Sequence, residues 1–414
     1  MNVPQELLDL ITHNLYDDIL TVRACSLAGR PFARSTRAHI FRRIKISPLS
    51  NSSESTSSGN RHTCQELYKL LTLKPHVAPL IEELEIVIVL VGSETNLESG
   101  KHHPPWIMSS RILSLVLPLL SLKRISLVED CPDHYNTELS LKWNKLGRKL
   151  KAALEDVFSS PTLESVHLRG IVVESPRQLL SLFSKGISIK DISLSRVYLH
   201  GPKARIPWPE SEPWSPQLRS ILLSDILNKP LLRYFVNPQI DLSHVESLTL
   251  ASDSVEWKAQ ILQAAQPEIL RLRSFHAPAS VGNNFEAFHF SKKLRSIHLF
   301  TEKILEWMTV LFKLCPDDCR IETMIFEGPT FYYRSCTNRW PHLEQYIKQG
   351  LARLPCLASV EIRGHDVEIR GHEEGHAWTD WEALLLRLMP SLVQRGLLTI
   401  TRIELLNGVH QGWE

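Results

Sequence analysis

Two short motifs contain residue types that can do chemistry. His372-Glu373-x-x-His376 matches the zincin pattern, in which two histidines on one helix face bind zinc and the glutamate acts as general base. Cys315 and Cys319 have a ligand-like spacing, but no second pair of ligands lies nearby in the sequence. A structural zinc at these cysteines is therefore not expected.

The zincin motif requires a helix, and its neighbours argue against one. Gly371 and Gly375 both disfavour a helical backbone. Thr379-x-x-Glu382 reads as a capping box, which would start the helix after the motif. We expect a loop at this motif, and hence no catalytic residue, no metal and no cofactor. A zinc hydrolase using His372, Glu373 and His376 is kept as an alternative of a different class.

The composition excludes several classes of protein. The 414 residues carry a formal net charge of +2, so no strong field attracts nucleic acid or an anionic membrane. The seven cysteines are scattered and odd in number, which favours a reducing compartment over a disulfide framework. The sequence has no signal-peptide pattern and no apolar run long enough to span a bilayer. We expect a cytoplasmic or nuclear protein that binds neither membrane nor nucleic acid.

One short phrase recurs from residue 80 onward: apolar, two variable residues, apolar, one variable residue, apolar. Leu163-Glu-Ser-Val166-His-Leu168 is the clearest copy. The central residues of the copies are Leu84, Ile125, Val166, Ile192, Ile221, Leu248, Phe275, Ile297, Met324, Val360 and Ile403. The centres at 192, 221 and 248 lie 29 and 27 residues apart, within the period of leucine-rich repeats.

The phrase predicts a strand followed by a return helix. Side chains alternate along a strand, so Val166 and Leu168 face a core while His167 faces solvent. Residues 176–183 and 302–312 show apolar side chains at helical spacing, and 141–158 reads as a longer amphipathic helix. The sequence therefore predicts an α/β leucine-rich-repeat solenoid, with a curved parallel sheet inside and helices outside.

The first 45 residues predict three short helices. The first is amphipathic, the second is capped by Asp17-Asp18, and the third runs from Phe32 to Phe41. Three helices of this length bury little apolar area alone, so such a unit is often completed by a partner. A plain helical cap on the solenoid is the alternative interpretation.

This stretch resembles the F-box, in the form that precedes degenerate leucine-rich repeats in fungal proteins. The resemblance rests on Val3-Pro-Gln-Glu-Leu7-Leu8-Asp-Leu-Ile11, Leu20, Ala24-Cys25-Ser26-Leu27, Arg30-Pro-Phe32 and His39-Ile-Phe41-Arg-Arg-Ile44. It implies docking on a Skp-type adaptor, and through it a cullin, while the repeats hold a protein substrate. The positions that match the adaptor-binding motif are Pro4, Leu7, Leu8, Ile11, Leu20, Cys25, Ser26 and Leu27.

These patterns divide the chain into three segments. Residues 1–46 are the F-box-like segment, 47–62 are a Ser-rich linker or loop, and 63–414 are the degenerate repeats. The expected function is that of a non-enzymatic substrate-recognition subunit of an SCF-type ubiquitin ligase. An interaction scaffold of the same fold without a ligase role is the alternative, since Pro31 is unusual for the F-box.

The outward residues of the strands form two columns on the expected concave face. The first is Glu83, Arg124, Ser165, Asp191, Ser220, Ser247, Ser274, Ser296, Thr323, Ser359 and Arg402. The second includes His167, Leu222, Thr249, His276, His298, Ile325, Glu361 and Glu404. Small side chains fit the crowded inside of a curved sheet, and the charged ends suit a groove that holds a protein or peptide.

Residues 201–216 are rich in proline and tryptophan and exclude a helix or central strand. Their tryptophans either fold back onto the repeats or anchor a partner. The candidate substrate-binding residues are therefore His167, Arg169, His276, His298, Glu361, Arg363, Trp208 and Trp214.

Overall fold

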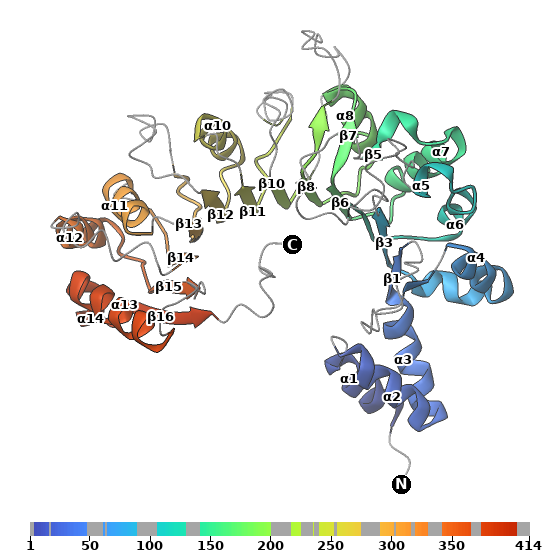
Figure 1. The fold of residues 1–414 in the computed structure, drawn as a ribbon, viewed down its shortest axis with the longest axis horizontal. Coiled ribbons are helices and arrows are strands. Elements are labelled where there is room, and N and C mark those ends of the chain that lie inside the picture. Colours follow the sequence, from blue (N-terminus) through green and yellow to red (C-terminus); the bar gives the residue numbers. More distant parts are fainter. Residues whose placement is uncertain are drawn as a thin grey trace, which may run out of the picture. The chain divides into compact units, whose positions relative to one another are not determined.

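The computed structural model describes fifteen stretches of the chain. They are residues 4–15, 18–47, 61–62, 64–88, 106–129, 141–199, 217–224, 235, 240–251, 255–274, 290–301, 304–315, 319–329, 342–365 and 374–403. The chain divides into two compact units, Met1–Glu212 (unit 1) and Pro213–Glu414 (unit 2). Both are mixed α/β, with parallel strands and helices (Figure 1).

Unit 1 begins with three helices, which confirms the prediction of three short helices. They are α1 Gln5–Asn14, α2 Ile19–Ala28 and α3 Arg30–Arg42. The Asp18 carboxylate caps α2 by accepting two backbone N–H groups of its first turn. Pro31 lies in the first turn of α3, where a missing N–H breaks no helical hydrogen bond. The proline therefore starts the helix smoothly, and α3 begins slightly earlier than Phe32.

A strand follows α3 without a linker. β1 Arg43–Ile46 pairs in parallel with β3 Glu83–Ile88, so that Ile44 lies opposite Leu84 and Ile46 opposite Ile86. Ile44 and Ile46 are fully buried. β2 Arg61–His62 pairs with β1 on its other side. The sheet thus starts inside the segment assigned to the F-box and includes the end of the Ser-rich segment, of which residues 48–60 lie outside the described stretches.

The recurring phrase forms β3, β4, β6 and β8 of unit 1, as predicted, whereas β1 and β2 of the same sheet were not predicted. The order in the sheet is β2-β1-β3-β4-β6-β8, all parallel. The predicted centres Leu84, Ile125, Val166 and Ile192 lie side by side in register and are at most 1% exposed. The bounds of the further strands are β4 Arg124–Glu129, β6 Ser165–Arg169 and β8 Asp191–Ser195.

Helices lie along one side of these strands (Figure 1). They are α4 Cys64–Leu73, the 3-10 turns η1 Pro75–Leu80, η3 Leu117–Leu119 and η4 Trp143–Lys145, and α5 Trp106–Ser109, α6 Leu113–Val116, α7 Arg148–Phe158 and α8 Pro176–Phe183. A second, small parallel sheet joins β5 Leu141–Lys142, β7 Ile171–Val173 and β9 Tyr198–Leu199.

The helix predicted over 141–158 is shorter than expected. Leu141 to Lys145 form a strand and a 3-10 turn, and Gly147 has an extended backbone that caps α7. The predicted apolar stripe is nevertheless buried, with Leu150, Leu154 and Val157 facing the core. The helical periodicity predicted the correct buried face of the helix. It placed the start of the helix too early, because it continued across Gly147, where α7 is capped.

Unit 2 repeats the same design with strands in simple chain order, from β10 to β16. The strands are β10 Ser220–Ser224, β11 Ser247–Ala251, β12 Ile269–Ser274, β13 Ser296–Thr301, β14 Thr323–Pro329, β15 Ser359–His365 and β16 Leu398–Ile403. The helices are α10 Val255–Ala265, α11 Ile304–Leu314, α12 Leu343–Arg353, α13 Glu374–Leu388 and α14 Pro390–Gln394. The paired strands are parallel, and the predicted centres Ile221, Leu248, Ile297, Met324 and Val360 are buried.

Two predicted centres in unit 2 are wrong. Leu270, not Phe275, lies between Leu248 and Ile297 in the sheet. Leu398, not Ile403, lies opposite Val360. The first error arose because Pro267 occupies the leading apolar position of the true phrase, which hid it from the pattern. The columns change accordingly: Ile269 replaces Ser274, Arg271 replaces His276, and Thr399 replaces Glu404.

Candidate protein-binding surfaces

The first candidate surface is a set of exposed apolar side chains on α1 and α2. Leu7, Leu10 and Ile11 share one face of α1, and Leu20 and Leu27 share one face of α2. Their exposed fractions are 51% for Leu7, 55% for Leu10, 46% for Ile11, 59% for Leu20 and 87% for Leu27. Five large apolar side chains open to water on two short helices are typical of a surface that a partner covers.

The other predicted adaptor-binding residues lie in mixed positions. Pro4 is exposed, whereas Cys25 and Ser26 are half-buried. The Ser26 hydroxyl donates to the Arg23 carbonyl oxygen at 2.6 Å within α2. Leu8 is only 4% exposed, so its side chain supports the helices from within and does not lie on the exposed face. Leu10 is exposed but was not among the predicted residues.

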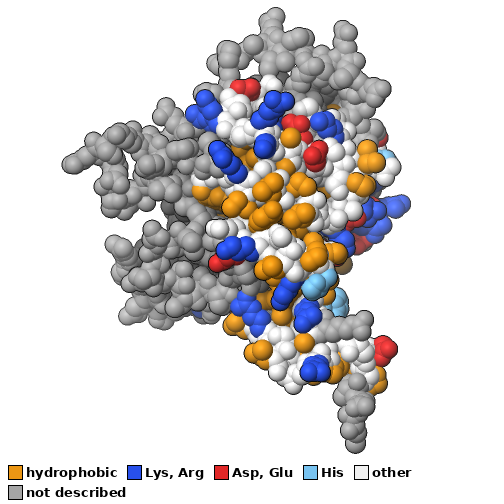
Figure 2. All heavy atoms as spheres, turned by 90° about the vertical axis from the view of Figure 1, so that its right-hand side faces the viewer, with side chains coloured by type: hydrophobic (Ala, Val, Ile, Leu, Met, Phe, Trp, Pro, Cys, Tyr) orange, Lys and Arg blue, Asp and Glu red, His pale blue; other side chains and the backbone are white. Residues whose placement is uncertain are grey.

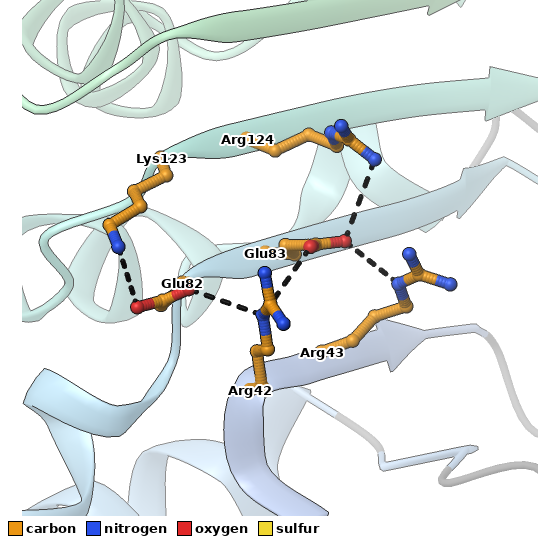
Figure 3. Close-up of polar contacts among 6 residues, drawn as sticks. All are labelled: Arg42, Arg43, Glu82, Glu83, Lys123 and Arg124. Carbon is orange, nitrogen blue, oxygen red and sulfur yellow. Dashed lines mark hydrogen bonds and ion pairs between the residues drawn. The ribbon is translucent and has the colours of Figure 1, made fainter. Parts of the chain in front are cut away.

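Ion pairs join these helices to the sheet at the start of the strands (Figure 3). Glu82 accepts from Lys123 Nζ at 2.7 Å and lies 3.2 Å from Arg42 Nε at the end of α3. The Glu83 carboxylate accepts a hydrogen bond from Arg43 Nε at 2.8 Å. The hydrogen bond from Lys123 is the main reason that the pKa of Glu82 lies below its usual value. The ion pairs hold the register of the first strands and anchor α3 to them.

The pairing also changes the meaning of the charged column ends. Glu83 and Arg124 were predicted as charges that hold a partner at the end of a groove, and Arg124 Nη1 lies 3.8 Å from Glu83 Oε2. Similar pairs recur one residue before other strands, as between Lys190 and Glu164 at 2.8 Å. The second position of the repeated phrase carries these charges, and reading that position along the sequence would have found them.

On the strand face of unit 1, the two predicted substrate-binding residues lie on β6. His167 is flanked in register by Ser126 and Ser193, and Arg169 by Val128 and Ser195. Both side chains are half-buried. This part of the face is therefore small and hydroxyl-bearing around two basic side chains, as the sequence predicted.

Unit 2 brings three predicted substrate-binding residues into one network on its strand face. His298 Nε2 on β13 lies 2.9 Å from Glu327 Oε2 on β14. Arg363 on β15 donates two hydrogen bonds of 2.9 Å to the Glu361 carboxylate, and its Nη1 lies 3.8 Å from Glu327 Oε2. Thr401 on β16 donates to Glu361 at 3.1 Å. We call these five residues the strand-face network.

The electrostatics of the strand-face network are mutually reinforcing. The two hydrogen bonds from Arg363 are the main cause that lowers the pKa of Glu361, and the same bonds raise the pKa of Arg363. Beside the network, the Arg273 guanidinium lies over the Phe300 ring, 5.1 Å from its centre. Such a surface presents charges in fixed positions, which suits recognition of a partner.

The sequence missed two members of this network for different reasons. Glu327 lies opposite Arg363 in a third outward column, of which the sequence prediction included only Arg169 and Arg363. Thr401 was hidden because the register of β16 was misplaced. Of the remaining predicted substrate-binding residues, His276, Trp208 and Trp214 lie outside the described stretches.

We expect Glu361→Gln to lower the free energy of unfolding by about 1–2 kcal/mol at pH 7, because Arg363 loses a charged acceptor. A carboxylate with a lowered folded-state pKa stabilises fully above its unfolded pKa, about 4.3, and that stability is lost as the pH falls through the folded pKa. The deficit should therefore shrink below about pH 4. Urea unfolding of both chains between pH 7 and 3.5 measures it.

Glu322→Gln is the matched control, because Glu322 pairs with Arg295 at 2.9 Å between two half-exposed side chains. It should change stability by less than about 0.5 kcal/mol. Equal deficits for the two variants, or a Glu361→Gln deficit that persists unchanged at low pH, would contradict the role given to the strand-face network.

The structure corrects the expected surroundings of the zincin-like motif. α13 begins at Glu374, so Thr379 lies inside the helix and does not cap it. A single glycine near the helix start was tolerated, contrary to the expectation. His376 belongs to α13, while His372 and Glu373 lie outside the described stretches. Among the described residues, no three His, Cys, Asp or Glu side chains are grouped as a metal site would require.

The cysteine pair is buried in unit 2: Cys315 directly follows α11, and Cys319 begins the next described stretch. Cys315 and Cys319 are 1% and 2% exposed. The hydrogen bond between the Cys315 and Cys319 thiols, followed by burial, raises the pKa of Cys315 because both favour its protonated form. A high pKa opposes the thiolate form that zinc ligation and nucleophilic attack both require.

The chain matches no protein-family model and no curated protein. Within the described stretches, each helix is too short or too polar to cross a membrane.

Proposed function

We propose that this chain is a non-enzymatic substrate-recognition subunit of an SCF-type ubiquitin ligase. In this proposal, α1–α3 act as an F-box that docks a Skp-type adaptor, and through it a cullin. The strands and helices after α3 act as degenerate leucine-rich repeats that hold a protein substrate, in the cytoplasm or nucleus. The ubiquitin-transfer chemistry takes place on the partner enzymes.

The observation that carries the proposal is the exposed apolar surface of α1 and α2. Leu7, Ile11, Leu20 and Leu27 match F-box positions in the sequence and are all open to water. A helical cap that served only to close the sheet would turn such side chains inward. Pro31 was the sequence argument for a scaffold that no longer docks an adaptor, and its place in the first turn of α3 weakens that argument.

The substrate would bind to the strand faces. The candidate residues are half-buried outward side chains: His167 and Arg169 on β6 in unit 1, and His298 on β13 with Glu361 and Arg363 on β15 in unit 2. Half-buried charges held by neighbours keep their positions before binding, which reduces the entropy lost on association. The direct ion pairs within the strand-face network favour a folded surface of a protein as the partner over a small molecule.

Reconstitution of the ligase core tests the proposal. The purified full chain is mixed with a Skp-type adaptor and a cullin, and the mixture is separated by size-exclusion chromatography. The chain should enter the cullin complex only when the adaptor is present. If the chain elutes alone in every mixture, the scaffold without a ligase role becomes the better interpretation.

A further inference from the structure

A second apolar surface lies on the helical side of unit 1, away from α1 and α2. Figure 2 shows apolar side chains gathered in the middle of this face, with Lys and Arg above and below them. Leu73 at the end of α4 is 80% exposed, Leu115 on α6 is 51% exposed, and Leu119 on η3 is 46% exposed. Pro118 between them is also exposed. We call these four residues the outer patch.

The outer patch is one continuous feature of the helix layer. α6 packs against both α4 and η3, and η3 packs against α7. The inner sides of the same elements are filled by buried residues such as Leu71, Leu113 and Leu117. The core is therefore complete without the patch residues, and their apolar side chains remain available to another molecule.

Exposed cations lie on the elements that carry the outer patch. Lys69 and Lys74 lie on and after α4, Arg111 precedes α6, and Arg148 and Lys149 start α7. Within the stretches that the structure describes, none of these five side chains makes a hydrogen bond or an ion pair. The exposed acidic side chains on the same helices are Glu66 and Asp156. By contrast, several cations at the start of the strands are paired with glutamates.

The apolar outer patch and the cations near it together indicate which kind of binding partner fits this surface. Apolar side chains on neighbouring helices form a surface for residues spaced at i, i+3, i+4 and i+7 on a single helix. The unpaired cations favour acidic residues on the flanks of that helix and oppose basic ones. A second copy of this chain would bring the same cations against each other, which disfavours self-association through the patch.

We propose that the outer patch binds an amphipathic helix of another protein, whose apolar stripe covers Leu73, Leu115 and Leu119 and whose acidic flanks pair with the surrounding cations. This inference goes beyond the proposed adaptor docking and does not depend on it, because the adaptor would bind α1 and α2.

A designed peptide tests the inference. The probe is a fluorescein-labelled, lactam-stapled helix of 18 residues with a leucine stripe and glutamate flanks, and its partner probe has the same stripe with lysine flanks. Fluorescence anisotropy of each probe is followed as full-length protein is added. The acidic probe should bind about 10-fold tighter than the basic one, and its affinity should fall with added salt.

Three variants locate the binding. The double substitution Leu115→Asp and Leu119→Asp should lower the affinity for the acidic probe by about 10-fold or more. The double substitution Arg111→Glu and Lys149→Glu should lower the affinity for the acidic probe and raise the affinity for the basic probe. Ile187→Asp changes an apolar residue that is 82% exposed after α8, and should leave binding unchanged. Circular dichroism confirms that each variant is folded, which is expected because all five positions are exposed.

Several outcomes would overturn the inference. One is equal affinity for the two probes, and another is no detectable binding of the acidic probe. A third is a loss of affinity in the Ile187→Asp control as large as that in the Leu115/Leu119 variant. Sedimentation of the chain with phosphatidylserine vesicles that is lost in the Leu115/Leu119 variant would assign the patch to a membrane surface instead. Concentration-dependent dimerisation lost in the same variant would assign it to a second copy.

Discussion

Replacing Phe158 with alanine is expected to lower the free energy of unfolding of unit 1 by about 3–5 kcal/mol. Phe158 is fully buried at the end of α7. Its ring lies edge-on to Trp143, with 6.3 Å between centroids, and to Phe183, with centroids 6.1 Å apart. The substitution removes the central ring of three, so both flanking rings lose contacts and a cavity is left beneath α7 and α8.

Phe158→Leu is the matched control, because leucine fills most of the volume and leaves a smaller cavity. It should lower the stability by about 1–2 kcal/mol. Urea unfolding followed by tryptophan fluorescence compares the variants, since Trp143 reports on the same cluster. A loss below about 1 kcal/mol for Phe158→Ala would contradict the assignment of this cluster to the core of unit 1.

Replacing both Leu7 and Leu20 with aspartate is expected to weaken adaptor binding by about 100-fold or more, which corresponds to about 3 kcal/mol. Each leucine is about half exposed in the isolated chain and would be buried in the complex. An aspartate there would be buried without a partner or would hold the surfaces apart. The exposed starting positions mean that the helices themselves should keep their stability.

Two further variants separate this effect from general ones. Leu73→Asp changes an equally apolar and more exposed leucine on α4, and it should leave adaptor binding unchanged. Leu8→Ala removes a buried side chain, so it should lower the melting temperature of the helices while changing adaptor affinity less than Leu7→Asp with Leu20→Asp. Equal losses of affinity from Leu73→Asp and from the double variant would show that binding does not occur at α1 and α2.

The sequence predicted the architecture because the repeated phrase ties local pattern to global packing. Each of Leu84, Ile125, Val166 and Ile192 occupies the same place in its strand, so one pattern gave both the strands and their register. The pattern failed where a repeat lacks its first apolar residue, as at Pro267 before β12. It also missed β1, although Phe41, Ile44 and Ile46 complete the phrase, because these residues were assigned to the end of the F-box-like segment.

The candidate surfaces were less predictable than the fold. The amphipathic pattern of α1 did not distinguish Leu8, which is buried, from Leu7 and Ile11, which are exposed, because all three belong to one broad apolar stripe of this helix. The strand-face network depends on the cross-strand contacts of Glu327 with His298 and Arg363, and of Thr401 with Glu361. Such contacts follow from the strand register, so an error of a few residues in the predicted register of one strand prevents their prediction.

Isothermal titration calorimetry with a purified Skp-type adaptor tests the central claim most directly. The adaptor is titrated into the full-length chain and into the variant with Leu7→Asp and Leu20→Asp. We expect a one-to-one complex with a dissociation constant of about 1 μM or tighter for the unmodified chain. The folded variant should bind at least 100-fold more weakly. Absence of binding by the unmodified chain, or equal binding by both chains, would contradict the assignment of α1–α3 as an adaptor-docking F-box.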